Sequence, residues 1–124
     1  MQQTIYIPFT LPGLNEIIAA AKSGHGRGNA YSRIKKKVMV NICWVIKRSK
    51  LQPVTACNLS FLWIEKDRRR DPDNICTGKK IILDSLVEMG ILQNDGWKQV
   101  KGFSDTWDVD AKAPGVMVTL VSSL

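Results

Sequence analysis

Hydrophobic and polar positions in the first part of the chain follow two different periods. Residues 4–8 alternate and are rich in β-forming side chains, which predicts a first strand that ends near Pro8. A short helix is expected over residues 15–22, with Asn15 as its N-terminal cap. Apolar side chains then recur at spacings of four and three within residues 31–50, which predicts the long helix of the molecule.

A second strand is predicted over residues 56–64. Apolar side chains share the face of Trp63, and Leu62 and Ile64 lie on the opposite face. Because both faces carry apolar side chains, we expect a central strand that is buried on both sides. Core positions are expected for three of the tryptophans, with an interface position as the alternative: Trp63, Trp97 and Trp107.

The remaining periodicity predicts one more helix and two more strands. The helix is expected over residues 77–89, ended by Gly90, and the strands over 97–107 and 115–121. The resulting order βαβαββ predicts the α/β (α+β) class, with two principal helices on a small mixed sheet. No linker or repeat divides the sequence, so residues 1–124 are expected to form one domain.

Composition and charge restrict the possible functions. Hydrophobic residues make up 44% of the 124 residues, which suffices for one core and argues against a disordered tail. The net charge of +7 is typical of a protein that binds polyanions. The three cysteines form no Cys-x-x-Cys pair, so neither a disulfide framework nor a zinc site is expected. Without a membrane span or a signal-peptide pattern, we expect a cytoplasmic protein of a bacterium or a phage-infected host.

Residues 66–74 carry the chemistry that is most informative about function. Three consecutive arginines come first: Arg68, Arg69 and Arg70. Two carboxylates, Asp71 and Asp73, then flank a proline. Guanidinium groups match phosphate oxygens, and carboxylate oxygens are typical Mg²⁺ ligands. The segment therefore predicts a site that holds a nucleic-acid backbone and hydrolyses it with a metal ion.

The spacing of the two aspartates allows them to share one cation. Pro72 biases Asp71 toward extended backbone, in which residues two positions apart point the same way. Asp73 has an alternative role as the N-terminal cap of a helix, and the arginines can alternatively pair with these acids. Two carboxylates this close are costly unless a cation or the arginines compensate them, and the presence of two acids favours a metal site.

A third acid, Asp95, lies beyond the helix that follows. Helix residues 79–90 would span about 16 Å, and the extended link to Asp95 can cover a similar distance. Asp95 therefore reaches the other two acids only if the link runs back along the helix. The alternative is that Asp95 and Gly96 form a plain turn.

Two lysines, Lys79 and Lys80, lie in the first turn of this helix, where the helix dipole disfavours cations. A lysine placed there can stabilise negative charge that develops on a phosphate. Helical phase puts Lys80 on the face of Asp84 and Lys79 about 100° away. Both lysines are candidates for this role.

The sequence resembles the RusA family of Holliday junction resolvases. The resemblance rests on residues 68–74, on residues 83–86 with Gly90, and on residues 94–95, with a weaker match at residues 11–15. It implies a homodimeric α/β endonuclease of DNA recombination and repair. It also implies that Mg²⁺ serves to cut symmetrically across four-way DNA junctions.

Roles carried over from that family make Asp71, Asp73 and Asp95 the catalytic, metal-binding acids. The family also implicates a lysine early in the helix. Counting back one turn from Asp84 selects Lys80 as this residue, with Lys79 as the alternative.

Further basic side chains are expected to contact the DNA backbone, which positions DNA without reading much sequence. The predicted DNA-binding residues are Arg27 in a Gly-rich loop, Lys35 and Lys36 on the long helix, Lys79, and the arginines Arg68, Arg69 and Arg70. The rival interpretation is a non-catalytic branched-DNA-binding protein, or a loosely specific branched-DNA nuclease, of phage origin.

Overall fold

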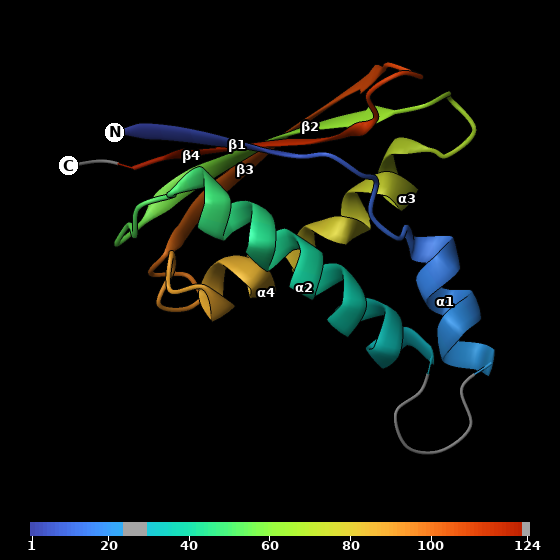
Figure 1. Ribbon diagram of the computed structural model, residues 1–124, viewed down its shortest axis with the longest axis horizontal. Helices are drawn as coiled ribbons and strands as arrows, with labels where there is room; N and C mark the ends of the chain where they lie inside the picture. The colour runs from blue at the N-terminus through green and yellow to red at the C-terminus, as the bar shows by residue number, and fades with distance from the viewer. Residues whose placement is uncertain (24–29, 123–124) are drawn as a thin grey trace.

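A four-stranded mixed sheet carries helices on one face in the computed structural model, which describes residues 1–23 and 30–122 (Figure 1). The elements, in chain order, are β1 (Gln2–Ile7), α1 (Leu14–Ser23), α2 (Ala30–Ser49), β2 (Cys57–Glu65), α3 (Pro72–Ile75), the 3-10 helix η1 (Cys76–Gly78), α4 (Lys79–Glu88), β3 (Val100–Val109) and β4 (Gly115–Val121).

The strands lie in the order β1-β4-β2-β3 across the sheet. β4 pairs antiparallel with both β1 and β2, whereas β2 and β3 are parallel. A parallel pair needs a crossover connection, and α3, η1 and α4 supply it. The predicted α+β class, with a small mixed sheet in a single small domain, is confirmed.

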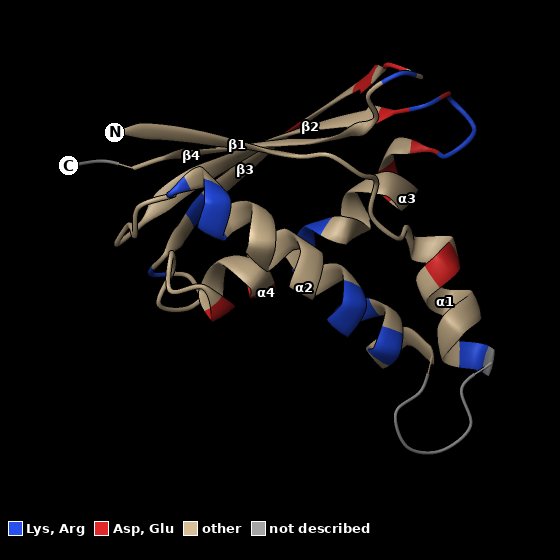
Figure 2. Cartoon of the chain, in the orientation of Figure 1, with Lys and Arg blue, Asp and Glu red and all other residues tan. Residues whose placement is uncertain are grey.

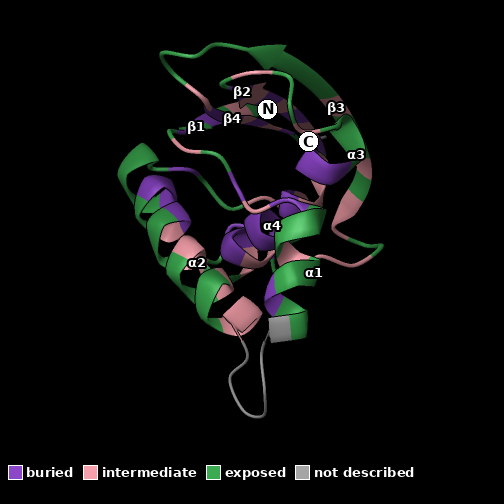
Figure 3. Cartoon of the chain, turned by 90° about the vertical axis from the view of Figure 1, so that its right-hand side faces the viewer, coloured by how far each residue is buried: buried purple, intermediate pink, exposed green. Residues whose placement is uncertain are grey.

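The core lies between the sheet and the helices α2 and α4. Ile5 and Phe61 both pair with Val118, and all three side chains are nearly fully buried. Leu62 and Ile64, on the other face of β2, are only half-buried. The prediction of a strand buried on both faces is wrong, because the helices lie on one side of the sheet (Figure 1). Figure 3 shows the same division, with α4 largely buried and much of α2 exposed.

The predicted helices are present, with one change at a boundary. α2 lies within one residue of the predicted range at each end, and Lys50 leaves it with φ of 57°. Gly90 has φ of 74° just beyond α4, as expected of a residue that ends a helix. The helix predicted over residues 77–89 begins only at Lys79, because α3 and η1 precede it as separate turns. Among the described residues, no helix is both long and apolar enough to cross a membrane.

The tryptophans occupy three different environments. Trp63 is 1% exposed and belongs to the core, as predicted. Trp97 is 96% exposed, because β3 begins only at Val100 and leaves it in the preceding loop. Trp107 lies on β3, which has a single neighbouring strand, and is 40% exposed. The core position is therefore wrong for Trp97 and Trp107, and the alternative interface position stays a prediction for both.

Candidate nucleic-acid and metal site

The arginine-rich segment leaves the end of β2 and is fastened there by Arg70. Its Nε and Nη2 donate to the two oxygens of Glu65 at 2.8 and 2.9 Å, and its Nη1 donates to the Leu11 carbonyl at 2.9 Å. The hydrogen bonds to buried Glu65 raise the pKa of Arg70. All three guanidinium nitrogens of Arg70 thus donate to protein oxygens. Arg70 is therefore not free to bind a phosphate, as the predicted DNA contact requires.

Arg68 and Arg69 are available to a ligand. The Arg69 side chain is 87% exposed, with its Nε 3.6 Å from an oxygen of Asp67. Within the described residues, the Arg68 guanidinium has no hydrogen-bond or ion-pair partner. Figure 2 shows the loop between β2 and α3 as a basic segment that leads into an acidic start of α3.

Asp71 and Asp73 lie at this start of α3. Asp71 has extended backbone, with φ of −76° and ψ of 153°, as expected before a proline. Pro72 then begins a helical turn, so the predicted extended geometry around both acids is wrong. Asp71 rather than Asp73 holds the N-cap position, and its side chain makes no capping hydrogen bond. Asp73 Oδ1 accepts the N–H of Asn74 at 2.9 Å. Both acids are exposed, and in the described part of the chain neither pairs with a cation.

Asn74 fixes α3 to the start of α1. Its side-chain oxygen accepts the N–H of Asn15 at 2.9 Å, and the residue is 9% exposed. Gly13 permits this approach, because a Cβ at that position would lie 2.6 Å from the same oxygen. α1 begins at Leu14, so the predicted capping role of Asn15 is wrong. Glu16 instead accepts the N–H of Gly13 at 2.6 Å, ahead of the first turn.

Lys80 is the centre of an ion-pair cluster on the first turn of α4. Its Nζ donates to Asp95 Oδ2 at 2.8 Å and lies 3.0 Å from Asp84 Oδ1, which confirms the shared helical face. The other oxygen of Asp84 lies 2.6 Å from the Nζ of Lys35 on α2. The link after α4 therefore runs back along the helix and returns Asp95 to its beginning.

The charges of this cluster support one another. Hydrogen bonds to Asp95 and Asp84 raise the pKa of Lys80. Burial alone would raise the pKa of Asp84, but the hydrogen bonds from Lys35 and Lys80 outweigh it and hold this pKa below its usual value. Lys80 and Asp84 are therefore both charged at neutral pH.

Lys79 points to the sheet instead. Its Nζ donates to Asp105 Oδ2 on β3 at 2.7 Å and lies 4.3 Å from the ring centre of Phe103. Asp105 also accepts the indole N–H of Trp63 at 2.9 Å. Only 17% of the Lys79 side chain is exposed, compared with 60% for Lys80. Lys79 anchors α4 to the sheet, so its position does not favour the predicted DNA contact.

Sequence reasoning misses two acids that organise this region, Glu65 and Asp105. Glu65 continues the buried alternation of β2, and Asp105 is in register with buried Phe61. A charged residue in phase with buried apolar positions indicates an ion pair at the edge of the core, because charges are rarely buried alone. The strand period is therefore a signal for Glu65, whereas β3 contains no buried residue and its own period gives no such signal for Asp105.

The other predicted DNA contacts are distributed as follows. Lys35 is paired with Asp84 and its side chain is 30% exposed, whereas Lys36 is exposed on the same helix. Arg27 lies outside the described residues. Lys36 therefore adds to the basic surface more directly than Lys35 does.

The three predicted metal ligands do not form one group. Among the described residues, no cluster of three or more His, Cys, Asp or Glu side chains is placed to hold a metal ion. Asp95 is engaged by Lys80, whereas Asp71 and Asp73 have no cationic partner in the described ranges. Mg²⁺ is commonly held by one or two carboxylates together with substrate phosphate and water. Asp71 and Asp73 therefore offer carboxylates that are open to Mg²⁺, whereas one oxygen of Asp95 is engaged by Lys80 and its metal role stays a prediction.

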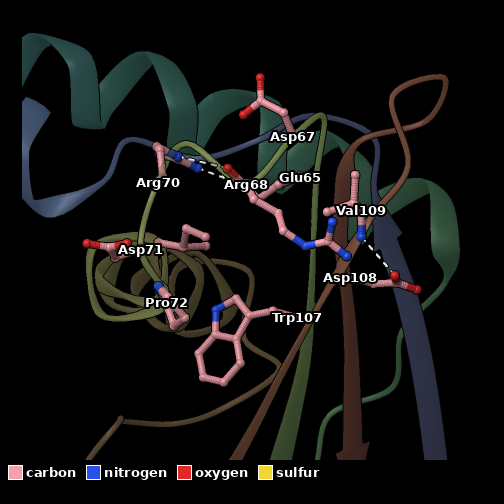
Figure 4. Close-up of a pocket in the computed structure, with 10 residues that line it drawn as sticks. Glu65, Asp67, Arg68, Arg70, Asp71, Pro72, Trp107, Asp108 and Val109 are labelled. Atoms are coloured by element: carbon pink, nitrogen blue, oxygen red, sulfur yellow. Dashed lines mark hydrogen bonds and ion pairs between the residues drawn. The ribbon is translucent and has the colours of Figure 1, made fainter.

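A pocket of about 330 Å³ borders the first of these acids (Figure 4). Its walls come from the segment after β2, from α3 and from the end of β3. The lining side chains include Glu65, Arg68, Asp71, Pro72, Trp107 and Asp108.

The segment after β2 and the start of α4 carry groups suited to phosphate chemistry. Exposed Arg68 and Arg69 can bind phosphate, Asp71 and Asp73 can hold a cation, and protonated Lys80 lies on the next helix. In comparisons with known proteins, no family model and no curated sequence matches the chain. Function is therefore inferred from the site itself.

Proposed function

We propose that the protein is a Mg²⁺-dependent, structure-specific endodeoxyribonuclease that resolves four-way DNA junctions by symmetric phosphodiester hydrolysis in recombination and repair. One observation carries the proposal. Exposed Asp71 and Asp73, without a cationic partner among the described residues, directly follow the arginines in a chain of net charge +7. Carboxylates at a phosphate-binding surface oppose DNA binding unless a cation lies between acid and phosphate. The resemblance to RusA resolvases points in the same direction.

The segment after β2 supplies binding and metal ligands. Arg68 and Arg69 contact the phosphates beside the scissile bond. Asp71 and Asp73 would hold Mg²⁺, which supplies an activated water and neutralises charge on the phosphate when it is bound. Arg70 contributes indirectly, because its bonds to Glu65 fix the backbone that carries these side chains.

α4 supplies the positive charge. Lys80, whose pKa is raised by hydrogen bonds to Asp95 and Asp84, remains protonated and stabilises the negative charge that develops on the phosphate. Asp95 is a positioning residue for this lysine in our proposal, in contrast to the ligand role that the family resemblance implies.

We further propose a homodimer. A four-way junction has two-fold symmetry of its own, so a two-fold dimer can place two identical sites against opposite strands. Symmetric cleavage then follows from the symmetry of the complex.

Asp71→Asn tests the proposal with synthetic four-way junctions and linear duplex, with and without Mg²⁺. We expect metal-dependent junction cleavage by the wild type and a loss of at least about a hundredfold in the variant, with junction binding intact. Asp110→Asn is the matched control, because it removes one carboxylate outside the site and preserves an acceptor for the Lys112 N–H. Cleavage by Asp71→Asn at the wild-type rate would show that the metal-site assignment is wrong.

A non-catalytic branched-DNA-binding protein is the second candidate. The ion pair between Lys80 and Asp95 favours it, because Asp95 is the third predicted metal-binding acid and here binds a lysine instead. This candidate predicts tight junction binding without cleavage in any metal. A loosely specific nuclease would instead cut junctions and linear duplex alike.

A further inference from the structure

The pocket beside Asp71 has an aromatic wall that the proposed function leaves unused. Trp107 supplies this wall from the end of the edge strand β3, and 40% of the residue is exposed. Figure 4 shows its indole ring next to Pro72. A large aromatic surface that is open to water at a pocket wall is suited to a second flat, apolar group, because stacking removes both faces from water.

The other walls restrict the identity of that group. The Arg68 side chain, without a partner among the described residues, extends toward Asp108 and Val109 (Figure 4). Asp108 also borders the pocket, but it follows Trp107 on β3, and its carboxylate points away from the indole ring and accepts the Val109 N–H (Figure 4). The stacking surface suits a flat base and the free guanidinium suits its phosphate, so the pocket matches two of the parts of a nucleotide.

We infer that this pocket receives one unpaired nucleobase of a DNA substrate, stacked on Trp107, with Arg68 on a neighbouring phosphate. The inference rests on the proposed function, because DNA bound along the arginine segment delivers the base. Every base of an intact duplex is stacked between its neighbours, so the base must come from an interruption in pairing. Since every base has a π-face, the pocket selects interrupted structure rather than sequence.

Two duplexes that differ only by one unpaired nucleotide test this inference. Binding is measured by fluorescence anisotropy in EDTA, so that cleavage does not contribute. The wild type is expected to prefer the interrupted duplex by about tenfold, in line with base–aromatic stacking. Trp107→Leu is expected to abolish the preference and leave affinity for the paired duplex unchanged. Trp107→Phe keeps an aromatic ring and is expected to retain most of the preference.

Trp97→Leu is the matched control, because it removes a 96% exposed tryptophan that does not line the pocket. It is expected to keep the full preference. The inference is overturned if Trp107→Leu keeps the preference, or if it weakens binding of both duplexes equally. If Trp107→Leu does not fold, the wild type still decides with 2-aminopurine as the unpaired base. Its fluorescence must fall on binding, because the base stacks on the indole, and an unchanged or rising signal overturns the inference.

The two proposals fail separately in this design. If the wild type shows no binding preference but does cleave with metal, the nucleobase pocket is overturned and the nuclease proposal stands. If the preference depends on Trp107 but no metal supports cleavage, the nuclease proposal is overturned and the nucleobase pocket stands.

Discussion

The guanidinium of Arg70 shows how different three adjacent arginines can be. Its partner Glu65 is the last residue of β2, with its side chain 11% exposed. A separate hydrogen bond from Arg70 Nη1 to the Leu11 carbonyl ties the segment after β2 to the connection between β1 and α1. Arg69 is one residue away, and its side chain is 87% exposed. The sequence alone assigns all three arginines to DNA, because nothing local in it distinguishes a guanidinium with a buried partner from one without.

Arg70→Met is expected to destabilise the protein by about 3 kcal/mol, because it leaves the carboxylate of Glu65 desolvated and unpaired. Urea unfolding measures this loss. Arg69→Met is the matched control and is expected to change stability by less than about 0.5 kcal/mol, since its ion pair lies in solvent. Equal effects of the two substitutions would contradict the structural role of Arg70.

At the scale of elements, α4 separates two adjacent lysines by function. Lys79 holds the start of the helix against β3 through Asp105, and Lys80 faces outward to Asp84 and Asp95. Helical phase predicts this divergence in direction. It does not predict which lysine meets the sheet, because Asp105 lies on a strand that the helix reaches only after folding.

Two lysine variants should therefore have opposite phenotypes. Lys79→Met is expected to cost about 2 kcal/mol of stability, because Asp105 keeps only the indole N–H as a partner. Lys80→Met is expected to change stability by less than about 1 kcal/mol but to slow junction cleavage by about a hundredfold. Urea unfolding and single-turnover cleavage by the folded proteins measure the two effects. If Lys79→Met slows cleavage and Lys80→Met does not, Lys79 rather than Lys80 is the catalytic lysine.

The carboxylate of Asp84 joins α2 to α4, and its contribution depends on pH. Its pKa in the folded protein lies below the unfolded value of about 3.9, so its stabilisation is present above that value and is lost as pH falls through the lowered folded pKa. Asp84→Asn is expected to cost about 1 kcal/mol at neutral pH, a small value because Lys80 is solvent-exposed. Urea unfolding should show this difference shrinking in acid below pH of about 4. A difference independent of pH would contradict the ion-pair account, and Asp110→Asn serves as the control with no such trend.

At the scale of the whole molecule, the sequence predicts the architecture better than the site. Burial on one face imposes period two on the strands, and β4 spans the range predicted for it. The path of residues 72–78 could not be predicted in the same way. Pro72 suits the first position of a helix as well as an extended segment, and helical turns prevail there. The pairing of Lys79 with Asp105 depends on a tertiary contact that no local pattern encodes.

The position of β4 also determines when the protein can fold during its synthesis. β4 is the last strand in the chain, yet it lies between β1 and β2. β1 therefore has no strand to pair with until residues 115–121 have left the ribosome, whereas β2 and β3 can meet earlier. Until that moment β1, with its apolar side chains Ile5 and Ile7, cannot take its place at the edge of the sheet. Completion of the sheet thus awaits its last strand, and the nascent chain exposes apolar surface that chaperones bind.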